Sequence, residues 1–171
     1  MSVRTPLADE ICPVARSLDI LGDAWALLIL REVFAGNRRF DGLKAELGIA
    51  DTVLSKRLQS LVEAGLLERS PYSGSVRPRV EYILTEAGED TLPILHSFAR
   101  WGRRHTTSPV PGRGILIVEC MVCGIESHNA DWCQTCAAPL DRQRTGWRRS
   151  SDPTKLIELA SDPKETSHAN V

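Results

Sequence analysis

Residues 40–82 constrain the fold of this chain more than any other segment. Residues 40–47 and 51–62 are predicted to form two short helices joined by a glycine-containing turn, and the apolar residues of the second recur at helical spacing. Residues 65–69 and 79–84 are typical of two strands on either side of a turn. A helix pair followed by a β-hairpin is a winged helix-turn-helix, so we expect a protein that reads duplex DNA.

Two more helices are expected ahead of this unit. Residues 13–21 begin at Pro13, which is tolerated in a first turn, and residues 24–33 follow Asp23, a favourable N-cap. The second of these helices is apolar nearly all round, which predicts that it is buried.

A helix predicted at residues 85–101 suggests a dimer. Its acidic first turn suits a helix N-terminus, and Leu92, Leu95 and Phe98 form an apolar stripe around and after Pro93. Because a single winged domain has little core on which to lay this stripe, we expect the helix to pair with its copy in a second subunit. A homodimer of this kind would read a palindromic site.

Composition divides the chain into four parts. Residues 10–105 are expected to form the winged domain, mainly α-helical with a β-hairpin wing, and residues 106–114 a linker rich in Pro and Gly. Residues 115–140 hold four of the five cysteines and are expected to form a small zinc-ribbon-like module. Residues 141–171, first basic and then polar, are expected to be largely disordered, with at most a short helix at residues 154–159.

The distribution of charge suits a nucleic-acid partner. The formal net charge is −1, but residues 34–79 carry eight Lys or Arg against five Asp or Glu. Electrostatic affinity depends on where cations lie as well as on their sum. No apolar run is long enough to span a bilayer, and residues 1–11 lack the apolar block of a secretory signal, so we expect a cytoplasmic protein with no membrane partner.

Several motifs of the first block resemble a known family. They are Cys12-Pro13-Val14, Leu18-Asp19, Gly22-Asp23-Ala24-Trp25, the Leu-Leu-Ile-Leu-Arg-Glu run at 27–32, Arg39-Phe40, Pro78-Arg79-Val80-Glu81-Tyr82 and Leu84-Thr85. Over roughly residues 10–104 they look like the HxlR family of bacterial winged helix-turn-helix regulators, relatives of the MarR group. The resemblance implies a homodimeric transcription factor that responds to aldehydes, quinones or oxidants. In some members, a cysteine at the position of Cys12 is a redox or electrophile sensor.

The exposed face of the helix at residues 51–62 supplies the candidate DNA contacts. With its leucines turned to the core, the residues left for the groove are Thr52, Ser55, Lys56 and Gln59. Lys56 suits phosphate or guanine acceptors and Gln59 suits adenine, whereas the alternative is an ordinary solvated helix face. Ser often opens this helix in the HxlR family, but Ala50 stands here, so we expect Asp51 to act as the cap.

The tip of the hairpin is basic. Arg77 and Arg79 flank Pro78, and this arrangement suits contacts to phosphates or to the minor groove. For Arg79 the structural alternative is an ion pair with a carboxylate such as Glu81 on a neighbouring strand.

Cys12 is a candidate redox sensor. It stands at a predicted helix start, where the positive end of the helix dipole stabilises a thiolate. The alternative is a small, buried apolar residue, which is how free cysteines usually behave. No partner cysteine lies nearby in sequence, so a disulfide would form between subunits or with a small thiol.

The other four cysteines form a metal-binding motif. Cys120, Cys123, Cys133 and Cys136 make two C-x-x-C pairs separated by nine residues, and Gly124 lets the backbone turn back toward a metal. We predict one structural Zn²⁺, with disulfides, an exchange-active C-x-x-C pair or an iron–sulfur cluster as alternatives. His128, within the loop, is either a substitute ligand or a solvated residue. The basic segment 142–149 either follows a phosphate backbone or is a solvated tail.

Together these features favour a sequence-specific transcriptional regulator that binds double-stranded DNA as a homodimer and responds to a small molecule or an oxidant. An enzyme would need a general base or an open metal position, and the four histidines form no recognisable constellation, so we expect no catalytic activity. The alternative function is a zinc-ribbon adaptor that docks on the transcription machinery.

Overall fold

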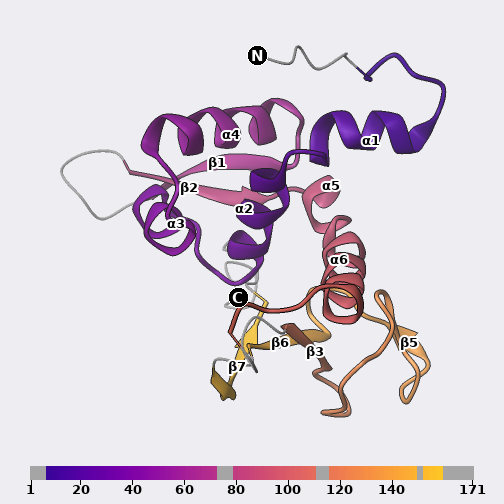
Figure 1. Ribbon diagram of the computed structural model, residues 1–171. Coiled ribbons are helices and arrows are strands. Elements are labelled where there is room, and N and C mark those ends of the chain that lie inside the picture. The colour runs from indigo at the N-terminus through magenta and orange to yellow at the C-terminus, as the bar shows by residue number, and fades with distance from the viewer. Residues whose placement is uncertain (1–6, 73–78, 111–115, 150–151, 160–171) are drawn as a thin grey trace, which may run out of the picture.

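The computed structural model describes residues 7–72, 79–110, 116–149 and 152–159, which form a winged helix-turn-helix with a small β-rich module packed against it (Figure 1). The helices are α1 (Pro13–Leu21), α2 (Ala24–Phe34), α3 (Phe40–Leu47), α4 (Asp51–Glu63), α5 (Glu86–Glu89) and α6 (Leu92–His105). The strands are β1 (Leu67–Tyr72), β2 (Arg79–Leu84), β3 (Leu116–Cys120), β4 (Trp132–Cys133), β5 (Ala138–Pro139), β6 (Thr145–Arg149) and β7 (Asp152–Glu158). No helix in the described part of the chain is long and apolar enough to cross a membrane.

The winged domain is built around α2, as its apolar sequence predicted. Ile29, Leu30 and Phe34 are fully buried, and α1, α3, α4 and β2 all contact this helix. The Asp23 carboxylate caps α2 by accepting a hydrogen bond from the Trp25 N–H at 3.0 Å. Gly48, in the left-handed conformation (φ 62°), ends α3 and turns the chain into α4. The antiparallel β1–β2 hairpin completes the predicted winged fold.

The helix predicted at residues 85–101 is two helices. Thr85 caps the short α5 through a 3.1 Å bond from the Gly88 N–H, and α6 begins afresh at Leu92 with Pro93 in its first turn, where no N–H is needed. Leu92 and Leu95 are 2% and 7% exposed within the chain. Our expectation that they lack intramolecular partners is therefore wrong. Phe98 and Trp101, on the same helix, are exposed.

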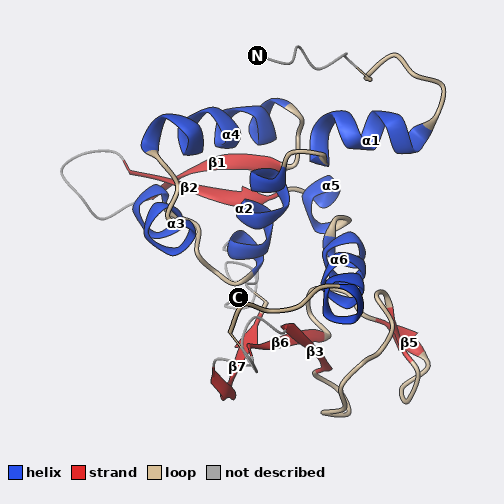
Figure 2. Cartoon of the chain, viewed as in Figure 1, coloured by secondary structure: helices blue, strands red, loops and turns tan. Residues whose placement is uncertain are grey.

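The C-terminal module is a three-stranded antiparallel sheet in the order β3–β6–β7, with the β4–β5 hairpin beside it (Figure 2). Two expectations fail here: residues 145–149 and 152–158 are strands rather than disordered chain, and residues 154–159 form no helix. The physical reason is that β6 carries Trp147, which is 1% exposed and pairs across the sheet with Val118 of β3 and Ile157 of β7. The last residues of the expected tail, 160–171, lie outside the described part.

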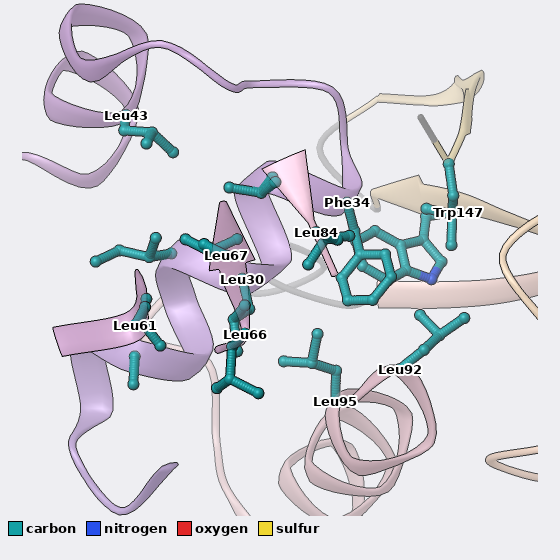
Figure 3. Close-up of a cluster of buried hydrophobic side chains, with 14 of the residues drawn as sticks. Leu30, Phe34, Leu43, Leu61, Leu66, Leu67, Leu84, Leu92, Leu95 and Trp147 are labelled. Carbon is teal, nitrogen blue, oxygen red and sulfur yellow. The ribbon is translucent and has the colours of Figure 1, made fainter. Parts of the chain in front are cut away.

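Trp147 joins the module to the winged domain in one continuous apolar core. Its ring lies 6.0 Å from that of Phe34, and Figure 3 shows Leu92 and Leu95 of α6 facing the same pair of rings. The linker, of which residues 106–110 are described and form neither helix nor strand, therefore does not separate two independent cores. Burial of a whole indole at this junction predicts that the two parts stabilise each other.

Ion pairs surround this apolar junction. Arg149 lies 3.0 Å from buried Glu32 of α2 and 2.7 Å from Glu46 of α3, and Arg142 lies 2.9 Å from Glu89 of α5. Arg148 pairs with Glu119 within the module at 2.6 Å. These three arginines of the basic segment thus hold the module together and against the winged domain, which corrects both interpretations of residues 142–149 as a solvated tail or a phosphate-tracking arm.

Candidate nucleic-acid interface and metal centre

The helix α4 presents a polar face to solvent. Leu54, Leu58 and Leu61 are buried against the core, which confirms the predicted helical spacing. The opposite face exposes Thr52, Ser55, Lys56 and Gln59. In Figure 1, α4 lies on the outer side of the β1–β2 hairpin. The role of these four residues in DNA contact remains a prediction.

The start of α4 differs from our expectation. Ala50 is the N-cap and makes no side-chain cap, whereas the Asp51 carboxylate pairs with the Lys44 ammonium of α3 at 2.8 Å. This hydrogen bond raises the pKa of Lys44 above its usual value. Asp51 therefore ties the two helices of the motif together, and the pairing offsets the negative charge that it brings near the expected DNA surface.

Two arginines that sequence reasoning did not single out support α4. Arg57 lies 2.7 Å from the Asp23 carboxylate at the start of α2, which fixes the tilt of α4 on the core. Arg69, an exposed residue of β1, donates to the Gln59 side-chain oxygen at 2.5 Å, while the Gln59 amide donates to Glu63 at 2.6 Å. Gln59 is thus held by neighbours on both sides. The signal for Arg69 was its place at the start of the wing, next to the recognition helix.

The wing is described only at its base. Arg77 lies outside the described residues, and so does the side chain of Arg79, whose backbone belongs to β2. Glu81, the partner considered for Arg79, pairs with Arg39 ahead of α3 at 2.9 Å. That ion pair ties the base of the wing to the helix-turn-helix.

Cys12 is the N-cap of α1 and is exposed. The alternative that it is a buried packing residue does not hold within this chain. The neighbouring Arg16 guanidinium donates to the backbone oxygens of Glu10 and Ile11 at 2.7 and 2.6 Å, which fixes the chain just ahead of the thiol. The α1 helix has no buried residue, and its Val14, Leu18 and Ile20 are exposed with Cys12.

The four C-terminal cysteines converge on one point. Their sulfur atoms all lie within 4.8 Å of one another, with 3.9 Å between Cys120 and Cys136 and 3.7 Å between Cys123 and Cys133. A tetrahedral ion with bonds of about 2.3 Å to four thiolates requires sulfur separations of about 3.8 Å. None of the four cysteines forms a disulfide, so the paired-disulfide alternative finds no support, whereas the exchange-active pair and the iron–sulfur cluster stay open as alternatives. The donor set fits a single ion that prefers soft sulfur ligands.

The backbone of each C-x-x-C pair is shaped alike. Gly124 follows the first pair at φ 70°, as its glycine predicted, and Ala137 follows the second at φ 48°. The Gly124 N–H donates to the Cys120 carbonyl at 2.8 Å, and the Cys136 N–H points to the Cys133 sulfur at 3.5 Å. His128 is not among the clustered ligands; it is exposed, with its Nδ1 3.9 Å from Glu126.

The electrostatics of the cluster also favour a bound cation. Burial raises the pKa of Cys120, but N–H groups of Cys123 and Val122 and neighbouring thiols outweigh this and bring it to about 7. The hydrogen bond with Cys123, together with burial, raises the pKa of Cys136 to about 12. Four crowded thiols therefore cannot all ionise without an added positive charge, and a bound dication would supply it.

A buried histidine, His96, connects α6 to the loop between Cys123 and Cys133. The Trp147 indole N–H donates to His96 Nε2 at 3.0 Å, so Nδ1 carries the proton and donates to the Ala130 carbonyl at 2.6 Å. Burial lowers the pKa of His96, although the bond to Ala130 opposes this. The neutral imidazole thus links α6, the cysteine loop and β6. Sequence reasoning grouped His96 only with the scattered histidines.

Comparison with known proteins identifies relatives of the winged domain. Residues 20–109 match the family described as HxlR-like helix-turn-helix. An uncharacterised HTH-type transcriptional regulator of Mycobacterium tuberculosis is 47% identical over 96 residues, and one of Synechocystis is 38% identical over 94. The Mycobacterium match covers 56% of this chain and 60% of the relative, and the Synechocystis match 54% and 69%.

Solved structures agree with this relationship. PA1607, assigned as a transcription factor, has a TM-score of 0.66 and 32% identity, covering 80% of this chain and 93% of its own. The redox regulator HypR in its oxidised form has a TM-score of 0.52 and 31% identity, covering 57% of this chain and 100% of its own. The likeness to PA1607 thus extends over more of the chain than the residues matched by the family.

Proposed function

The chain belongs to the HxlR-like helix-turn-helix family, and on this premise we propose that it regulates transcription by binding duplex DNA as a homodimer at a palindromic operator. The observation that carries the proposal is the exposed polar face of α4, flanked by the base of a β-hairpin wing. Thr52, Ser55 and Lys56 are exposed there, and no described helix or strand covers them, which is the arrangement that a recognition helix needs to enter the major groove.

The dimer is supported by apolar surface that the single chain leaves uncovered. Phe98 and Trp101 of α6 are 59% and 60% exposed, and Val14 and Leu18 of α1 are also exposed. Large side chains of this kind mark association surfaces when they gather on one element. A two-fold pairing through α6 would bury Phe98 and Trp101. It would also present one α4 helix from each subunit to each half of a palindromic site.

Binding to DNA is best tested on fragments selected from random sequence by the purified protein. Lys56→Ala should weaken binding and reduce the slope of log affinity against log salt by about 0.9 for each phosphate that the lysine neutralises. Lys155→Ala is the matched control, because Lys155 is exposed on β7, away from α4 in Figure 1. Equal salt slopes for the native protein and the Lys56 variant would remove Lys56 from the interface.

We further propose that the four cysteines hold one structural zinc ion. The sulfur separations and closed four-ligand geometry support a structural rather than a catalytic site. Elemental analysis of protein purified under reducing conditions should give one zinc per chain. If the analysis instead finds stoichiometric iron and the protein has a visible chromophore, the site holds an iron–sulfur cluster and the zinc assignment is wrong.

A third proposal concerns control by oxidants. Cys12 is exposed, and HypR, to which this chain is similar, is a redox regulator. Treatment with peroxide, or with a quinone that alkylates the thiol, should change operator affinity in the native protein and not in Cys12→Ser. Because the four metal ligands are also thiols, zinc content is measured alongside. If operator affinity changes in parallel with zinc loss in both the native protein and Cys12→Ser, the oxidant-sensitive thiols are the metal ligands and not Cys12.

A further inference from the structure

A cavity of about 320 Å³ lies between α6 and the loop that joins the two C-x-x-C pairs. One wall is the C-terminal half of α6 and the other is residues 126–129 of the loop, with β3 at the base. The cavity therefore sits on the joint between the winged domain and the cysteine module, outside both the α4 face and the cysteine cluster.

The α6 wall is strongly cationic. Arg100, Arg103 and Arg104 all line the cavity, at i, i+3 and i+4 spacing, so their side chains are neighbours on one helix face. Arg103 is neutralised by Glu126 at 2.7 Å. Arg100 donates to the His128 backbone oxygen at 3.1 Å, and among the described residues it has no ion pair with a carboxylate. Arg104 makes no hydrogen bond or ion pair among the described residues.

The position of these arginines at the C-terminal end of α6 explains only in part why three cations lie together. Cations near a helix C-terminus are favoured by the helix dipole. Like charges one turn apart nevertheless repel each other, although all three side chains are exposed and solvent screens part of that repulsion. An anion in the cavity would relieve that repulsion, and arginine suits carboxylates because it can donate two parallel hydrogen bonds.

Part of the remaining lining is apolar, beside the polar residues His96, Glu126, Ser127, His128 and Asn129. Leu116 and Val118 of β3 and Ala99 of α6 contribute hydrocarbon surface, and Val118 is 7% exposed. An apolar base below a cationic rim matches a ligand with an apolar body and one acidic end. We propose that this cavity binds a small organic carboxylic acid, held by Arg104 and Arg100 with its apolar part against Leu116, Val118 and Ala99.

This binding site is independent of the proposed function, because its test requires no DNA. Benzoate is the probe. Benzamide is the control that lacks the negative charge, and acetate is the control that keeps the carboxylate but lacks the apolar ring. Binding to the full, metal-loaded chain is measured by calorimetry, and the Nε–H signals of the arginines are followed by NMR. Benzoate should bind more tightly than either match and should shift the signals of Arg100 and Arg104.

Two variants remove the site by different means. Arg104→Gln deletes the charge and should weaken benzoate binding about tenfold to a hundredfold, the range for loss of a charged hydrogen bond. Ala99→Leu fills the apolar part of the cavity from the α6 wall and should weaken benzoate binding without weakening acetate binding. Arg144→Gln is the control, since Arg144 is exposed and does not line the cavity.

The proposal fails under three results. Equal binding of benzoate and acetate, unaffected by Ala99→Leu, would mean a surface that attracts any anion. If benzamide binds as tightly as benzoate, the arginines do not recognise the carboxylate of the ligand. Absence of probe binding together with a change in dimer dissociation for Arg104→Gln would assign this face to a second copy of the chain.

Discussion

Replacing Arg149 by Gln should destabilise the whole chain, because Arg149 ties the C-terminal module to two helices of the winged domain. Its guanidinium lies 3.0 and 3.2 Å from the two carboxylate oxygens of Glu32, whose side chain is 2% exposed, and 2.7 Å from Glu46. Burial lowers the pKa of Arg149, but the hydrogen bond to Glu46 and the charge of Glu32 outweigh it and raise the pKa. The group is therefore a permanent cation.

The size of the effect follows from what Glu32 retains. Removing one partner of a buried ion pair typically costs about 3–5 kcal/mol. Arg31 stays 2.7 Å from Glu32, and the Arg149 side chain is 34% exposed, so we expect a smaller loss of about 2–3 kcal/mol. Glu46→Gln should cost less than about 1 kcal/mol, because that carboxylate is 46% exposed. The double variant Glu32→Gln/Arg149→Gln should regain part of the loss, since no buried charge is left without its partner.

Urea unfolding of the full chain, reduced and saturated with metal, measures these differences. Tryptophan fluorescence and far-UV circular dichroism should report one coincident transition with an unchanged urea dependence, because Trp147 belongs to the core shared by both parts. Arg144→Gln is the matched control on an exposed arginine of the same segment. If Arg149→Gln were no more destabilising than Arg144→Gln, or if the two probes gave separate transitions, the idea of a clamp across one core would be wrong.

Three other perturbations have definite expected outcomes. Removing the metal with a chelator should lower the melting temperature of the entire chain and not only unfold the module, since Trp147 packs on Phe34. A melting temperature of the winged domain that is unchanged by the chelator would contradict this. Because burial lowers the pKa of His96, the unfolded chain gains a proton first as the pH falls below about 6.5, so stability should drop by up to about 1.4 kcal/mol per pH unit there and stay level above it. His96→Gln should lose that pH dependence in urea titrations, and an unchanged slope would assign it to other groups. Phe98→Glu should give folded monomers on sedimentation, whereas Leu95→Glu should reduce folding itself; a dimeric Phe98→Glu protein would place the interface elsewhere.

Local signals in the sequence accounted for the winged domain. Helical spacing separated the buried leucines of α4 from its polar face, Asp23 capped α2, and Gly48 ended α3, because each depends on residues within a few positions. The spacing of the two C-x-x-C pairs likewise predicted the cluster that the structure brings together, since chelation by short loops is a local property. Asp51 was misjudged because its partner, Lys44, lies across the turn on the preceding helix.

Only the tertiary structure decided what the C-terminal segment does. From sequence, residues 142–149 resembled a solvated basic tail, because the carboxylates that pair with Arg149 lie 117 and 103 positions earlier and the partner of Arg142 is Glu89. The same distance in sequence hid the role of Trp147, whose ring closes the core between Phe34 and His96. Charge and hydrophobicity along a chain indicate which groups need partners. Which partners they find depends on contacts between distant segments, and here those contacts turn an expected appendage into part of the core.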